Sequence, residues 1–165
     1  MATYLAISRF ARILAIVGLA AAVAACAKEP KSTGSTALGG SAAPGSSQDF
    51  VVNVGDRVFF ETDSTELTIV SRTTLDRQAA WLKRYPSFAI TIEGHADERG
   101  TREYNIALGA RRAEVVRAYL VGQGVGANRF RTISYGKERP VAVCNDISCW
   151  SQNRRAVTVV NSAGT

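Results

Sequence analysis

The sequence predicts a two-layer α/β sandwich, with helices on one face of a mixed β-sheet, preceded by a disordered tether. Short runs of β-branched and aromatic residues alternate with two longer segments in which apolar residues recur at helical spacing. The resulting order is β-α-β-α-β-β, with a long irregular segment before the last strand. A chain of 165 residues is long enough for one such domain and an N-terminal arm.

The first 25 residues have the pattern of an export signal. Arg9 and Arg12 supply positive charge ahead of an apolar run at 13–23. This run is shorter than the roughly 20 residues of a membrane-spanning helix. We therefore predict a signal peptide at 1–25.

Residues 23–26, Val-Ala-Ala-Cys, resemble a bacterial lipobox, in which the cysteine becomes the lipidated first residue of the mature protein. Several acyl chains on one residue hold firmly to a membrane. We therefore expect lipidation of Cys26, and by analogy with retention signals Ala27 favours the outer membrane. The alternative is a soluble periplasmic protein cleaved near Ala25.

Residues 26–49 are expected to form the lipidated N-terminus and a flexible tether. They consist largely of Gly, Ser, Ala, Thr and Pro, with hardly any large apolar side chain to bury. The folded domain is predicted at 50–163.

The first half of the domain carries signals for a strand, a helix and a strand. A run of β-formers predicts a strand at about 57–60, and another predicts a strand at 89–93 that ends at Gly94. Between them, apolar residues recur at helical spacing until Pro86 stops the helix. The apolar face of this helix is formed by Leu75, Ala79 and Leu82. The candidate N-terminal caps are Ser71, Thr73 and Thr74.

The second half repeats the helix-to-strand order. Thr101 or a neighbour caps a helix that ends at Gly122. Strands are expected at 130–135 and 156–160, separated by an irregular loop at 136–150.

Composition restricts the classes of function. The chain has 20 Lys plus Arg against 14 Asp plus Glu, and this modest excess is weak evidence for nucleic-acid binding. Cys144 and Cys149 lie five residues apart in the long loop, so a local disulfide is expected in an oxidising compartment. Two thiols without a second pair make a poor zinc site, and His95, the only histidine, is expected to shape a loop.

The polar loop at 94–101 is the candidate site. A helix N-terminus favours an anionic ligand, whereas Asp97 favours a cation. Asn105 and Arg112 are two helical turns apart with Leu108 between them, so all three share one face. An ammonium on Asp97 and a carboxylate on Arg112 would suit an amino-acid-like head group. The basic residues Arg111 and Arg154 are expected to be solvated or paired with Glu98, Glu103 or Glu114.

Several motifs together resemble the OmpA-like peptidoglycan-binding domain. They are Gly-His-Ala-Asp-Glu-Arg-Gly at 94–100, Tyr-Asn-Ile-Ala-Leu-Gly at 104–109, Arg-Arg-Ala at 111–113, Ser-Tyr-Gly at 134–136 and Asn-Arg-Arg-Ala at 153–156. The resemblance implies that Asp97 and Arg112 grip the ammonium and carboxylate of diaminopimelate in the peptidoglycan stem peptide. It also places Asn105, Leu108 and the loop residues Phe60, Glu61 and Thr62 in the pocket.

The resemblance further implies an outer-membrane lipoprotein with a monomeric periplasmic domain, which ties the membrane to the cell wall. The implied partners are peptidoglycan, TolB and other proteins of the Tol system, which acts in envelope integrity and cell division. Binding without catalysis, cofactor or metal is expected. The alternatives are a peptidoglycan-modifying enzyme, a soluble wall-binding module, and a stator-like or porin-associated relative.

Overall fold

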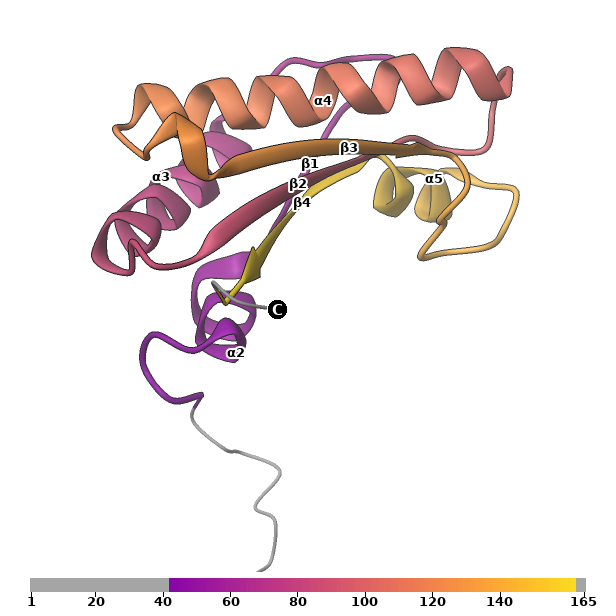
Figure 1. The fold of residues 1–165 in the computed structure, drawn as a ribbon. Helices are drawn as coiled ribbons and strands as arrows, with labels where there is room; N and C mark the ends of the chain where they lie inside the picture. The colour runs from indigo at the N-terminus through magenta and orange to yellow at the C-terminus, as the bar shows by residue number, and fades with distance from the viewer. Residues whose placement is uncertain (1–41, 163–165) are drawn as a thin grey trace, which may run out of the picture. The chain divides into compact units, whose positions relative to one another are not determined.

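A computed structural model describes residues 42–162, and Figure 1 shows their fold. Four strands form one sheet in the order β1-β4-β2-β3. Strands β2 and β3 are parallel, whereas β4 is antiparallel to both of its neighbours, β1 and β2. The predicted mixed sheet is therefore confirmed. The strands are β1 (Arg57–Phe59), β2 (Ala89–His95), β3 (Phe130–Gly136) and β4 (Arg155–Asn161).

Helices α3 (Ile69–Arg84) and α4 (Arg102–Gly122) bury the apolar face of this sheet. Figure 1 shows α4 running along the sheet. The side chains of β2 alternate, so that Ile90 and Ile92 are buried while Thr91 and Glu93 on the other face are half-buried. The helices contribute Leu75, Ala79, Leu82, Ala113, Val116 and Leu120 to the same core.

Helix α4 and strand β2 meet at two glycines. A Cβ atom on Gly94 would lie 1.8 Å from the backbone oxygen of Gly109, and one on Gly109 would lie 2.4 Å from Ser134 Oγ. Only the absence of both side chains permits this approach. The contact fixes the helix that carries Asn105, Leu108 and Arg112 against the strand that leads to Asp97.

Two helices differ from the sequence-based expectation. Helix α3 is capped by Thr68, whose Oγ1 accepts from Ser71 N at 3.1 Å, and thus begins before the expected caps. The loop expected to be irregular contains α5 (Ile147–Asn153), which Asp146 caps by accepting from Ser148 N at 2.7 Å. A short turn η2 (Ala127–Arg129) precedes β3.

Ordered structure begins before Phe50, within the predicted tether. Helix α2 (Ser47–Asp49) leads into a π-helical segment, η1 (Phe50–Gly55). Asp49 accepts from Trp81 Nε1 at 2.8 Å, and the buried Phe50 ring packs 4.9 Å from the Trp81 ring. These contacts draw the valine-rich segment into a helix although its residues favour strands. The predicted signal peptide, Cys26 and residues 27–41 lie outside the described residues.

None of the helices within residues 42–162 is both long enough and apolar enough to cross a membrane.

Candidate functional site

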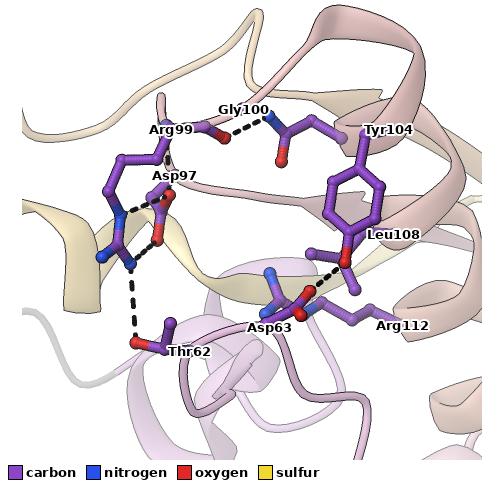
Figure 2. A pocket seen from close by; sticks show the side chains of 9 residues that line it. Thr62, Asp63, Asp97, Arg99, Gly100, Tyr104, Leu108 and Arg112 are labelled. Atoms are coloured by element: carbon purple, nitrogen blue, oxygen red, sulfur yellow. Dashed lines mark hydrogen bonds and ion pairs between the residues drawn. The ribbon is translucent and has the colours of Figure 1, made fainter.

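A cavity of about 200 Å³ lies where β1 and β2 end and α4 begins. Figure 2 shows its walls. It brings together five of the predicted site residues, which are Thr62, Asp97, Asn105, Leu108 and Arg112, with four others, which are Asp63, Arg99, Gly100 and Tyr104. An opening of this size is smaller than the roughly 300–1,000 Å³ of drug-sized pockets and suits one end of a ligand.

The carboxylate of Asp97 follows β2 and is largely buried. Arg99 donates to it from Nε at 3.1 Å, from Nη2 at 2.7 Å and from its backbone N at 3.2 Å. Burial alone would raise the pKa of Asp97. The hydrogen bonds and charge of Arg99, with a contribution from Arg154, outweigh burial and lower this pKa, so Asp97 is ionised at neutral pH.

The guanidinium of Arg112 is completely buried at the opposite wall. It donates to three backbone oxygens, those of Ser64 at 2.9 Å, His95 at 2.9 Å and Glu61 at 3.1 Å. Burial, together with the charge of Arg154, lowers its pKa to about 10, so it stays protonated at neutral pH. Three of its five N–H groups are thus used within the protein, which leaves two without an acceptor among the described residues.

The structure places Phe60 and Glu61 outside the cavity. The ring of Phe60 is buried, and the Arg112 guanidinium lies 5.1 Å from its centroid. The exposed Glu61 contributes only its carbonyl oxygen to Arg112. Both residues therefore contact Arg112 and hold its guanidinium in place, but they do not line the cavity.

Asn105 and Tyr104 shape the walls from the first turn of α4. Asn105 Nδ2 donates to the carbonyl oxygens of Arg99 at 2.7 Å and Thr101 at 3.1 Å, and so fixes the loop that carries Asp97. The hydroxyl of Tyr104 donates to Asp63. Asp63 adopts φ 54°, a left-handed conformation that aspartate tolerates better than most residues.

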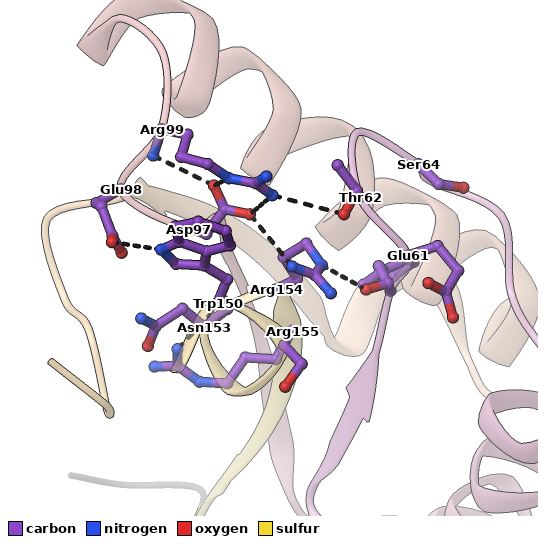
Figure 3. Close-up of polar contacts among 12 residues, drawn as sticks. Glu61, Thr62, Ser64, Asp97, Glu98, Arg99, Trp150, Asn153, Arg154 and Arg155 are labelled. Carbon is purple, nitrogen blue, oxygen red and sulfur yellow. Dashed lines mark hydrogen bonds and ion pairs between the residues drawn. The ribbon is translucent and has the colours of Figure 1, made fainter. Parts of the chain in front are cut away.

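Arg154 is neither solvated nor paired with Glu98, Glu103 or Glu114, so the prediction for this residue is wrong. Its side chain is 5% exposed, with Nη1 3.4 Å from Asp97 Oδ2 and Nε donating to the Phe60 oxygen at 3.1 Å (Figure 3). The residue directly precedes β4, and its contacts with Asp97 and the Phe60 oxygen hold it in the interior. Arg111 is exposed, as expected.

Helix α5 supports the site through Trp150. The Arg99 guanidinium lies 4.2 Å from the indole centroid, and Trp150 Nε1 donates to Glu98 (Figure 3). A disulfide joins Cys144 to Cys149, next to Trp150. Sequence reasoning missed Arg99 and Trp150 as part of the site, although Arg99 lies in the same loop two residues after Asp97.

His95 ends β2 on the face away from the helices, and it is buried. Burial, with the charges of Arg155 and Arg139, lowers its pKa to about 4. The imidazole is therefore neutral at neutral pH, and its 3.6 Å approach to Glu93 is not an ion pair. Among residues 42–162, neither ring nitrogen has a hydrogen-bond partner. Within the described part of the chain, no three His, Cys, Asp or Glu residues are grouped to hold a metal ion.

Comparisons with known proteins give one consistent result. A model of the OmpA family matches residues 59–156. A peptidoglycan-associated lipoprotein of Agrobacterium fabrum is 66% identical over 151 residues, which cover 88% of this chain and 85% of the relative. One of Haemophilus influenzae is 40% identical over 153 residues, covering 91% and 97%.

Solved structures extend the likeness to the fold. The crystal structure of the peptidoglycan-associated lipoprotein from Burkholderia pseudomallei is 40% identical, with a TM-score of 0.66, and the match covers 70% of this chain and all of that one. The C-terminal domain of Helicobacter pylori MotB shares the fold at 23% identity and a TM-score of 0.61, over 66% of this chain and 86% of that one.

Proposed function

Because this chain belongs to the OmpA family, we propose that it is a lipoprotein that binds peptidoglycan without covalent chemistry, through the diaminopimelate end of the stem peptide. One observation carries the proposal: a single small cavity holds an ionised carboxylate, Asp97, and a protonated guanidinium, Arg112. The distal carbon of diaminopimelate bears one ammonium and one carboxylate. The two charges of the ligand thus match the two charges of the cavity.

The names of the relatives support the same conclusion. Both are peptidoglycan-associated lipoproteins, and the matches span most of their length. Thr62 and Leu108 line the cavity beside the charged groups, so a polar contact and an apolar contact are available to the ligand's side chain. Binding there requires no nucleophile, and we propose none.

The test measures binding of the full-length chain, purified in detergent, to isolated cell walls and to a tripeptide that ends in meso-diaminopimelate. We expect Asp97→Asn to weaken binding at least tenfold, the scale of one lost charge-assisted hydrogen bond. The matched control is Asp76→Asn, because Asp76 is an exposed carboxylate on α3 that pairs with Tyr119 instead. Equal loss in both variants, or in neither, would remove the assignment of Asp97.

The cellular role is the finer part of the proposal. Lipidation of Cys26 would hold the chain in the outer membrane while the domain grips the wall. Association with TolB and other Tol proteins would connect that grip to envelope constriction in cell division. Replacing Cys26 with serine should release the protein from the outer-membrane fraction, and retention of the variant there would contradict the lipid anchor.

A further inference from the structure

All acceptor positions of the Asp97 carboxylate are occupied in this structure. A carboxylate offers about four lone-pair positions. Oδ1 accepts from Arg99 N and Nε, while Oδ2 accepts from Arg99 Nη2 and, more weakly at 3.4 Å, from Arg154 Nη1. Three of the four donors thus belong to Arg99. A ligand ammonium can reach Asp97 only by displacing some of them.

Arg99 is the donor that can move. Its side chain is 40% exposed and lines the cavity, whereas that of Arg154 is 5% exposed and is also bound to the Phe60 oxygen. An exposed guanidinium is easily rehydrated, but a buried one without a partner is costly. We therefore expect Arg154 to stay on Asp97 when a ligand binds, and Arg99 to turn away.

Trp150 limits how far Arg99 turns. The guanidinium lies over the indole, 4.2 Å from its centroid, and this contact does not use the N–H groups that bind Asp97. The indole is fixed in turn by its hydrogen bond to Glu98 and by its place in α5. Arg99 can therefore release Asp97 and still remain as a cation at the rim of the cavity.

We propose that Arg99 is a specificity-determining residue, which makes the site select a ligand with an ammonium and a carboxylate on one carbon over a ligand with an ammonium alone. The inference rests on the proposed function. When the ammonium takes Asp97, the adjacent carboxylate gives the displaced Arg99 a new counter-ion. One internal ion pair is exchanged for two pairs with the ligand. A lysine side chain would take Asp97 and leave Arg99 unpaired.

Arg112 adds to this preference by attracting the ligand carboxylate, but it is not the residue that penalises a ligand with an ammonium alone. Its guanidinium is buried and holds three backbone oxygens whether or not a ligand is present. It loses no partner when a ligand ammonium enters, so a ligand without a carboxylate forgoes a contact with Arg112 but breaks none. Arg99 does lose its partner, and for this reason a missing carboxylate leaves Arg99, but not Arg112, without the counter-ion that it had before the ligand bound. Trp150 acts as a positioning residue for it.

The experiment compares two tripeptides that differ only in the distal carboxylate, L-Ala-γ-D-Glu-meso-diaminopimelate and the same peptide with L-Lys. Dissociation constants are measured by calorimetry for the full-length chain in detergent. The parent should prefer diaminopimelate. In Arg99→Gln the preference should fall about tenfold or more, with lysine-peptide binding unchanged or tighter. Trp150→Leu should lower the preference in the same direction by a smaller factor.

Arg102→Gln is the matched control, because Arg102 is an exposed arginine three residues further along that pairs with Glu138 at 3.2 Å. Its preference should equal that of the parent. An unchanged preference in Arg99→Gln would overturn the inference, as would a parent that binds both peptides equally. A parent that binds neither peptide would instead refute the proposed function, so the two failures are distinguishable.

Discussion

Replacing Gly94 with alanine tests the contact on which the geometry of the site depends. The new methyl group would lie 1.8 Å from the Gly109 oxygen, 2.6 Å from the Gly109 carbonyl carbon and 3.2 Å from Ala113 Cβ. The first two are backbone atoms inside a helix, so they cannot turn aside, and α4 must move away from β2 by more than 1 Å to restore ordinary contact distances of roughly 3.4 Å. Overpacking of this kind costs about 1–3 kcal/mol, occasionally more.

Three glycine variants should form a graded series in urea unfolding. Gly94→Ala should lower the free energy of unfolding by about 3 kcal/mol. In Gly109→Ala the new methyl group meets the Ser134 hydroxyl at 2.4 Å and the Gly94 oxygen at 2.8 Å. Alanine also has the higher helix propensity, so the free energy of unfolding should fall by less, about 1–2 kcal/mol. Gly122→Ala would meet none of the described residues within 4 Å and lies in the last turn of α4. The free energy of unfolding should therefore be unchanged or rise by up to about 1 kcal/mol.

Peptide binding adds a second readout to the series. Helix α4 carries Asn105, Leu108 and Arg112, so moving it away from β2 changes their distances to Asp97. Under conditions in which every variant is folded, Gly94→Ala should bind the diaminopimelate tripeptide at least tenfold more weakly, while Gly122→Ala should match the parent. The result to compare is the free energy of unfolding of Gly94→Ala and Gly122→Ala. A difference within about 0.5 kcal/mol, the usual scatter of neutral surface substitutions, would mean that the glycine contact does not control the packing of α4.

Three further predictions concern buried groups and the disulfide. Arg112→Met leaves three backbone oxygens without a donor and should lower the free energy of unfolding in urea by about 3–5 kcal/mol. Arg112→Lys should restore part of the lost stability. A loss below about 1 kcal/mol in Arg112→Met would contradict a structural role for these buried hydrogen bonds. The folded-state pKa of His95, about 4, lies below the ordinary 6.5, so the unfolded chain binds the proton first and stability is lost as pH falls from about 6.5 to 4. At 1.36 kcal/mol per pKa unit, the loss in the free energy of unfolding should be at most about 3–4 kcal/mol. His95→Gln should lack this dependence on pH. Replacing Cys144 and Cys149 with serine should lower the free energy of unfolding by about 2 kcal/mol or less, because the loop they close is short. It should also weaken peptide binding, because α5 is then held less firmly. An unchanged affinity would contradict this role of the disulfide.

The meeting of Asp97 with Arg112 was predictable from local sequence signals. Asp97 follows a strand, and the spacing from Asn105 to Arg112 sets one helical face. The bonding of Arg112 was not predictable, because its three acceptors belong to two segments 17 to 51 residues away. Only the assembled sheet, in which β1 pairs with β4, brings the chain after β1 to Arg112 on α4. The sequence therefore indicates which groups meet, but not which of them are already paired.

The errors have related causes. A pair of arginines before a strand resembles a solvated cluster, yet Arg154 is drawn inward because Asp97 and the Phe60 oxygen bind it. The valines after Phe50, for which no strand was predicted, also depart from their local preference for strands, because contacts with Trp81 in a distant helix hold the segment as a helix. Helix α5 is only seven residues long, below the length at which a helical pattern is distinct, and its contacts with the long loop hold it in place. One such contact is Asn153, whose side chain binds Val141 and Ala142.

The pairing of β1 with β4 determines how the domain bears a mechanical load. The described chain enters beside α2, at the end of the sheet away from α5, and β1 then runs toward the loop that lines the cavity (Figure 1). A pull between the N-terminal end and a bound ligand therefore acts along β1. The hydrogen bonds to β4, from Arg57 opposite Val157 to Phe59 opposite Arg155, lie across that direction. They are loaded in shear and must break together, whereas a pull across the strands would open them one at a time.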